Sequence, residues 1–216
     1  GELDVEDGEI KVPDFKIEGT ASELFGDKIY AVEAEEVDEI FDKIQSDSTP
    51  SQKDEQIKLM MDKFKTSVIS PMIDNAKDRF GRDLSASASK ALERKISTDV
   101  QWSMNKAVDE LQILQKSIDA EKDDALRKTS DAEERIEIEK KFEKEKTVRI
   151  AEFKKSIDST LDDLVNNAGR DIVERVLTNQ QNQKKKTIED AVRDHLRGFS
   201  RTIPSFLMAY GSVGEI

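Results

Sequence analysis

The sequence predicts a mainly α-helical fold, a helical bundle with one long antiparallel helical hairpin and a small extended or β arm at the N-terminus. Three observations support this. Apolar residues recur at helical spacing over most of the chain. No Gly or Pro occurs in the 87 residues between Gly81 and Gly169. Charged residues make up 38% of the chain and hydrophobic residues only 36%, which favours extended helices with narrow apolar stripes over a thickly layered core.

Residues 1–33 form an acidic arm in this interpretation. The net charge of the whole chain is −12, and residues 1–47 account for all of it, with 16 Asp and Glu against 4 Lys and Arg. Short alternating runs at residues 9–12 and 14–17, set among Gly and Pro, predict one or two short strands or an extended segment. Such an arm cannot hold a core alone, so we expect it to pack against another element or a neighbouring domain.

Residues 34–81 are predicted to form short amphipathic helices. The first has its apolar face at Val37, Ile40, Phe41 and Ile44. Thr49 as N-cap with Pro50 at the first helical position starts the second helix, whose apolar face is Ile57, Met60, Met61, Phe64 and Val68. We expect Pro71 to stop this helix and begin a third, which Gly81 closes in a left-handed conformation.

Residues 82–169 form the predicted hairpin. Two apolar series at helical spacing flank a polar junction, and Ser130 followed by Glu133 matches a capping box. We therefore place a turn near residues 128–130, between a helix over residues 85–127 and one over residues 131–168. The alternative is one uninterrupted helix through Ser130.

The tip of this hairpin, residues 121–147, contains 10 acidic and 8 basic side chains. Three opposite-charge pairs have the favourable i, i+4 spacing: Asp131 with Arg135, Glu137 with Lys141, and Glu145 with Arg149. We expect a solvated tip that protrudes.

Residues 170–216 are predicted to form the C-terminal helices and an apolar tail. A helical run over residues 171–177 leads into a polar stretch, 178–183, that is either a loop or a solvated helix surface. A last helix begins near Thr187 and ends at Gly198, and residues 199–211 are the most apolar patch of the chain.

The residue inventory offers no catalytic, cofactor-binding or metal-binding site. There is no Cys, no Gly-rich phosphate loop and one histidine, His195, which we interpret as a helix-surface or interface residue near a helix C-terminus. Trp102 and the Met and Phe residues at helical spacing are interpreted as packing groups. Carboxylate pairs such as Asp123 and Asp124 are expected by chance in helices this charged.

One basic cluster could contact nucleic acid or a protein partner: Lys184, Lys185, Lys186, Arg193, Arg197 and Arg201. The competing interpretation is an ordinary solvated helix surface, since no aromatic residue interleaves with the lysines.

The chain has neither a signal peptide nor an apolar run long enough to span a membrane, so we expect a soluble, cytoplasmic protein without a membrane partner. It begins without Met and stops directly after the apolar patch, from which we expect a piece of a longer polypeptide.

The C-terminal string DHLRGFSRTIPSFLMAYG, residues 194–211, resembles a stretch that follows the helicase motor in R subunits of type I restriction enzymes. The resemblance covers only about 18 residues. It implies a parent that is an ATP-dependent DNA translocase and endonuclease, with ATP and Mg²⁺ as cofactors. It also implies that this region packs on the parent's own motor domains, docks modification and specificity subunits, or guides DNA.

Three functions follow as hypotheses. The first is a non-catalytic helical region of such an R subunit. The second, which needs no resemblance, is a free-standing coiled-coil adaptor or oligomerisation module that dimerises through its long apolar stripe. The third is direct DNA binding by the basic face at residues 184–201.

Overall fold

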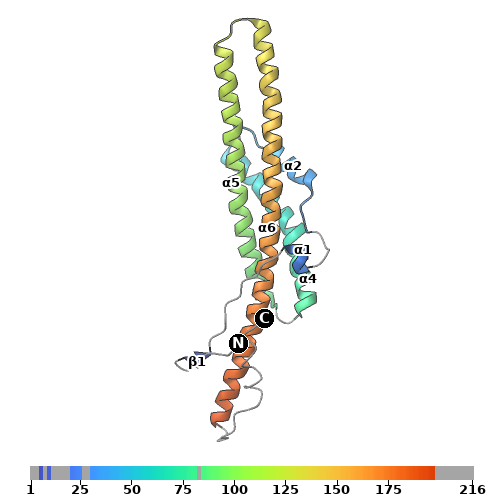
Figure 1. Ribbon diagram of the computed structural model, residues 1–216, viewed down its shortest axis with the longest axis vertical. Helices are drawn as coiled ribbons and strands as arrows, with labels where there is room; N and C mark the ends of the chain where they lie inside the picture. Colours follow the sequence, from blue (N-terminus) through green and yellow to red (C-terminus); the bar gives the residue numbers. More distant parts are fainter. Residues whose placement is uncertain (1–4, 7–8, 11–19, 26–29, 82–83, 198–216) are drawn as a thin grey trace.

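The computed structural model describes residues 5–6, 9–10, 20–25, 30–81 and 84–197. Two long helices, α5 (Ala86–Arg127) and α6 (Ala132–Arg197), lie antiparallel and set the long axis of the molecule. The shorter helices pack along the side of the hairpin away from its tip (Figure 1). The predicted fold class, a mainly helical bundle with a long antiparallel hairpin, is confirmed.

The hairpin turn lies at residues 128–131, so the interpretation as two helices is confirmed over one continuous helix. The capping residue is Asp131 and not Ser130. The Glu133 N–H donates to Asp131 Oδ1 at 3.4 Å, and the Arg135 N–H donates to the Asp131 carbonyl at 3.0 Å. A carboxylate placed here also interacts favourably with the positive end of the helix dipole.

Helix α6 is longer than predicted, because it continues through Gly169 and the polar stretch 178–183 to Arg197. The predicted helix end at Gly169 and the separate last helix are therefore wrong, whereas of the two interpretations of residues 178–183 the solvated helix surface is confirmed over the loop. Gly169 is buried, and a Cβ added there would lie 3.3 Å from Phe25 Cε2 and 3.5 Å from the Cα of Ala21. The missing side chain lets a short helix, α1 (Ala21–Phe25), approach α6 closely, so packing accounts for this glycine.

Helix α1 is also a correction, because residues 1–33 were expected to form an extended or β arm without a helix. It is tied to α6 by a hydrogen bond of 2.8 Å from the Ala21 N–H to Asn166 Oδ1. Phe25 and Tyr30 are buried with their rings edge to face. Before it, the strands β1 (Val5–Glu6) and β2 (Glu9–Ile10) pair antiparallel, with Val5 opposite Ile10. The predicted run at residues 14–17 lies outside the described residues.

The short helices begin with α2 (Ala34–Asp42), which buries Val37, Ile40 and Phe41 as predicted. Helix α3 (Pro50–Phe64) starts at the predicted Thr49 N-cap, where the side chains of Thr49 and Gln52 form a reciprocal capping box. The start of α3 therefore follows from local sequence.

Pro71 does not stop the helical run. A π-helical turn, η1 (Lys65–Ile69), joins α3 to α4 (Ser70–Phe80), and the Ser70 N–H bonds to the Lys65 carbonyl five residues back. The wider turn accommodates a proline that has no N–H to donate and would crowd the preceding turn of a regular helix. Gly81, with a positive φ of 51°, closes α4.

One core joins all of these helices. Its α5 side is the predicted apolar stripe, from which Leu92, Ile96, Val100, Met104 and Leu111 are buried. Its α6 side includes Ile157, Leu161, Ala168 and Ile172. These apolar residues of α5 therefore pack within the chain, against α6 and the short helices.

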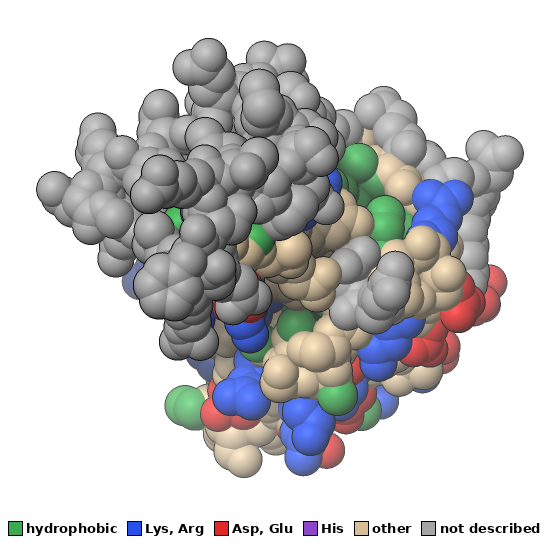
Figure 2. Space-filling view, turned by 90° about the horizontal axis from the view of Figure 1, so that it is seen from below, with side chains coloured by type: hydrophobic (Ala, Val, Ile, Leu, Met, Phe, Trp, Pro, Cys, Tyr) green, Lys and Arg blue, Asp and Glu red, His purple; other side chains and the backbone are tan. Residues whose placement is uncertain are grey.

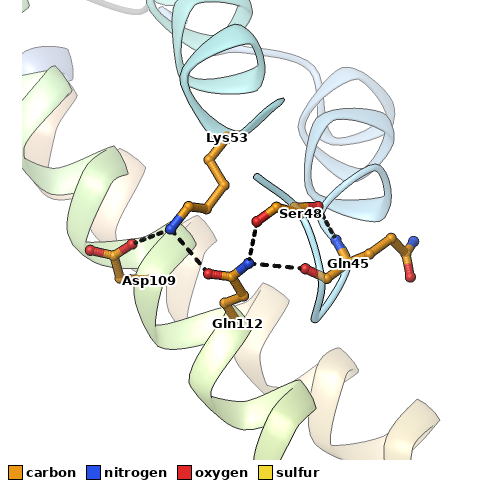
Figure 3. Close-up of polar contacts among 5 residues, drawn as sticks. All are labelled: Gln45, Ser48, Lys53, Asp109 and Gln112. Carbon is orange, nitrogen blue, oxygen red and sulfur yellow. Dashed lines mark hydrogen bonds and ion pairs between the residues drawn. The ribbon is translucent and has the colours of Figure 1, made fainter. Parts of the chain in front are cut away.

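A polar clamp fixes the α2–α3 loop to α5 (Figure 3). Gln112 donates to the carbonyls of Ser48 at 2.9 Å and Gln45 at 3.3 Å, and it accepts from Lys53 Nζ at 3.0 Å. Lys53 also pairs with Asp109 at 3.3 Å. One turn further on, Gln115 donates to the Ile44 carbonyl at 2.8 Å, while its Oε1 is buried without a hydrogen-bond partner.

Candidate functional site

The predicted basic cluster lies on the C-terminal part of α6, beyond the level at which α5 begins (Figure 1). Lys184 and Lys185 are half-buried, and Lys186 and Arg193 are exposed. The side chains of Arg197 and His195 and the whole of Arg201 lie outside the described residues. The structure therefore places four of the six predicted contact residues.

These four side chains do not form one uniform basic face. Three consecutive lysines on an α-helix point in directions about 100° apart, so Lys184, Lys185 and Lys186 spread around the helix. Lys185 lies 3.9 Å from Glu189, and Arg193 lies 3.4 Å from Asp190. Viewed from this end of the molecule, the described Lys and Arg side chains are interspersed with Asp and Glu (Figure 2). The geometry favours a mixed-charge helix surface, and DNA contact stays a prediction.

A groove lies between the start of α5 and the middle of α6. Its volume is about 370 Å³, and α5 contributes small and apolar side chains together with Lys95, while α6 contributes polar ones. The lining residues are Ala88, Ala91, Leu92, Lys95, Asp171, Glu174, Arg175 and Thr178. Across this groove Lys95 Nζ lies 2.8 Å from Asp171 Oδ1.

The hydrogen bond to Asp171 raises the pKa of Lys95 above its ordinary value of 10.5; partial burial opposes this, and the charges of Asp171, Asp99 and Glu174 support it. An ammonium held charged in this way is a poor base or nucleophile at neutral pH. We therefore assign the pair to structure, as an ion pair that ties the start of α5 to α6.

No group of His, Cys, Asp and Glu in the described part of the chain is arranged to hold a metal ion. Within the same residues, no helix combines the length and apolar character required to cross a membrane.

The hairpin tip is the most distinctive surface of the molecule. Between positions 118 and 157 no side chain is buried, although both helices continue through this region. Half-buried residues, among them Leu126, Ile138, Phe142 and Ile150, form the seam between the two helices. This segment protrudes well beyond the short helices, as predicted (Figure 1).

Ion pairs between the helices replace core packing along this tip. Lys146 lies 3.7 Å from Asp119, and Arg149 lies 3.6 Å from Glu121. All three i, i+4 pairs suggested by the sequence lie within the described residues. Among these residues only the pair of Glu145 with Arg149 forms, at 3.7 Å.

Arg135 does not pair with Asp131 as expected, and its guanidinium instead binds backbone carbonyls at the end of α5. Arg135 Nη1 donates to the carbonyls of Leu126 at 2.7 Å and Thr129 at 3.0 Å, so it caps the C-terminus of α5 from the opposite helix. Sequence spacing alone gives no signal for this contact, because the turn between the helices creates it.

We compared the chain with protein-family models, curated proteins and solved structures, and none of them matches it.

Proposed function

We propose that this chain is a non-catalytic docking region of a type I restriction endonuclease R subunit, in which the hairpin tip presents a binding surface to another subunit. The resemblance of residues 194–211 supports the R subunit. The protruding tip, with no side chain buried between positions 118 and 157, supports the docking role.

The energetics of the tip support this role. Ordering a residue costs about 1–2 kcal/mol of backbone entropy, and in most helices tertiary burial offsets that cost. Here only half-buried seam contacts, helix propensity and exposed ion pairs remain, and exposed pairs contribute about 0–1 kcal/mol each. A long, ordered extension that adds so little to the core is suited to reaching a partner.

The charge of the tip favours a protein partner over nucleic acid. With 10 acidic and 8 basic side chains in residues 121–147, the tip has no excess positive charge to attract phosphates. In an R subunit, the modification and specificity subunits are the protein partners implied by the resemblance.

Replacing residues 121–147 with a short Gly-Asn turn, in the R subunit that carries them, tests the proposal. We expect co-purification with the modification and specificity subunits to be lost while the base of the hairpin stays folded. A control variant carries a hairpin of equal length and unrelated surface, and we expect it to fail as well. Assembly at wild-type affinity by the shortened variant would rule out docking through the tip.

DNA guidance by the end of α6 is the second proposed role, supported only by the basic cluster. Lys184, Lys185 and Lys186→Ala should then weaken a salt-dependent DNA affinity. Binding that is absent, or that does not change with salt, would exclude this role.

Dimerisation as a coiled-coil adaptor would require the hairpin to open, because the long apolar series of α5 on which that alternative depends is buried within the hairpin and against the short helices.

A further inference from the structure

One face of α5 is free of the packed core and carries two large apolar side chains. Trp102, the single tryptophan of the chain, and Ile113 are each 67% exposed. They are 11 residues apart, which brings them to nearly the same side of the helix, roughly 16 Å apart along its axis. Lone exposed apolar residues are common on proteins, but two in line on one helix face form a potential contact surface.

Charged residues at helical spacing complete this face. Six exposed residues lie within about 100° of one another around the helix. In chain order they are Asp99, Trp102, Lys106, Asp109, Ile113 and Lys116. We call this set the α5 stripe. It lies away from the buried face of α5, where Val100, Met104 and Leu111 pack into the core.

The α5 stripe is complementary to itself when it is reversed. If a second copy lies antiparallel, with a two-fold axis between positions 107 and 108, Asp99 faces Lys116 of the second copy and Lys106 faces its Asp109. Trp102 then faces Ile113. Two-fold symmetry repeats each pair, so all four acidic and all four basic groups have an opposite charge across the interface. A parallel arrangement would instead set each charge against its own kind.

The contacts already present in the chain are compatible with this arrangement. Lys106 Nζ lies 5.5 Å from the centre of the Trp102 ring, which keeps the ammonium beside the apolar anchor. Asp109 binds Lys53 through Oδ1, but its side chain remains 65% exposed and can accept a second cation. The face needs no rearrangement of the hairpin before it can pair.

We propose that two copies of this chain associate through the α5 stripe as an antiparallel, two-fold symmetric dimer, with Trp102 and Ile113 as the apolar anchors. One helix face per copy makes a small interface, so the dimer belongs to the weak, reversible class. This surface is separate from the hairpin tip, and its failure would leave the proposed docking role untouched.

Sedimentation velocity over a concentration series tests the association. We expect a reversible monomer–dimer equilibrium, together with a blue shift of the Trp102 fluorescence as the dimer forms. Ile113→Ala should weaken the dimer about tenfold or more, whereas Ile136→Ala, at a 53% exposed position on the tip, should leave it unchanged. A concentration-independent monomer, or equal effects of the two substitutions, would overturn the proposal.

Charge exchange tests the pairing itself. Lys116→Asp sets two carboxylates against each other and should weaken the dimer, while the double variant Asp99→Lys with Lys116→Asp should restore it. Lys90→Asp makes the same charge change at an exposed α5 position outside the stripe and should have little effect. A double variant as weak as the single one would exclude the proposed pairing.

Cross-linking tests the antiparallel orientation. Because the chain has no native cysteine, only the introduced cysteines can form a disulfide. Asp99→Cys and Lys116→Cys chains, when mixed and oxidised, should form the mixed disulfide. Each variant alone should not cross-link, because like positions lie roughly 25 Å apart in the antiparallel dimer. Efficient cross-linking within a single variant would contradict this orientation.

Discussion

Gln112 and Gln115 lie one turn apart on α5 and are both buried. We predict that replacement by the similarly sized Met lowers the unfolding free energy at Gln112 but does not lower it at Gln115. Gln112→Met leaves the carbonyls of Gln45 and Ser48 without their side-chain donor and removes one acceptor from Lys53. At about 1 kcal/mol for each hydrogen bond to a carbonyl, the loss in unfolding free energy is about 2 kcal/mol. Lys53 limits the loss because it keeps Asp109.

Gln115→Met removes one hydrogen bond, to the Ile44 carbonyl, but it also removes a buried oxygen that has no partner. The first change costs about 1 kcal/mol and the second relieves a penalty of about 1–3 kcal/mol. We therefore expect the unfolding free energy to be unchanged or to rise by up to about 2 kcal/mol.

Urea unfolding followed by far-ultraviolet circular dichroism measures both variants. With a slope of about 2 kcal/mol per molar urea, the midpoint should fall by about 1 M for Gln112→Met, and for Gln115→Met it should stay the same or rise by up to about 1 M. Equal losses in the two variants, or a larger loss for Gln115→Met, would refute the account of the clamp.

Three further predictions follow from the packing. The raised pKa of Lys95 means that its ion pair with Asp171 stabilises the fold below the unfolded-state pKa and is lost as pH rises through the higher folded-state pKa. Because the Lys95 side chain is 60% exposed, Lys95→Met should cost only tenths of a kcal/mol at neutral pH. The cost should disappear as the pH rises through the raised pKa of Lys95, and a cost that does not fall with rising pH would contradict the assignment. Replacing residues 121–147 with a short turn should leave the unfolding free energy within about 1 kcal/mol of wild type, because no side chain there is buried. The same urea titration measures it, and a large loss of stability would show that the tip belongs to the core. Gly169→Leu should displace α1 at a cost of about 1–3 kcal/mol and speed amide hydrogen exchange at Phe25, whereas the single added carbon of Gly169→Ala requires the Phe25 ring to shift by only a few tenths of an ångström and should cost less. Full protection of α1 in Gly169→Leu would count against the close packing.

Local sequence patterns predicted the features that depend on neighbours along the chain. Thr49 and Pro50 start α3 because the cap and the proline act within a single turn. The buried faces of α2 and α5 follow from helical spacing, which fixes the residues that share a side. The hairpin turn was placed within about one residue, although Asp131 caps α6 where Ser130 was expected.

The two wrong helix ends, at Pro71 and Gly169, depend on contacts that local sequence does not contain. A glycine inside a helix costs only about 1 kcal/mol, which the packing of Phe25 and Ala21 against it can offset. The π-helical turn at residues 65–69 likewise accommodates Pro71. Neither residue type ends its helix here. Packing against Phe25 and Ala21 keeps Gly169 within α6, and the π-helical turn keeps Pro71 within the helical run.

For the functional surfaces, composition located the charged tip, because 18 charged side chains in residues 121–147 leave few apolar residues to bury. The basic cluster was identified by counting residues, which does not reveal that Lys185 and Arg193 lie beside acidic partners. The α5 stripe was missed because Trp102 was interpreted as a packing group. Its position, off the helical spacing of Val100 and Met104, was the signal that could have identified an exposed face.

The distance between the two helices of the tip tests the central claim most directly. Spin labels attached to Ala120→Cys and Thr147→Cys, both exposed positions, can be measured by pulsed electron paramagnetic resonance in this cysteine-free chain. In the hairpin the labels sit on adjacent helices whose axes are roughly 10 Å apart, so a short distance is expected. One uninterrupted helix would separate the same positions by roughly 40 Å, and that result would contradict the protruding two-helix arm on which the proposed docking role depends.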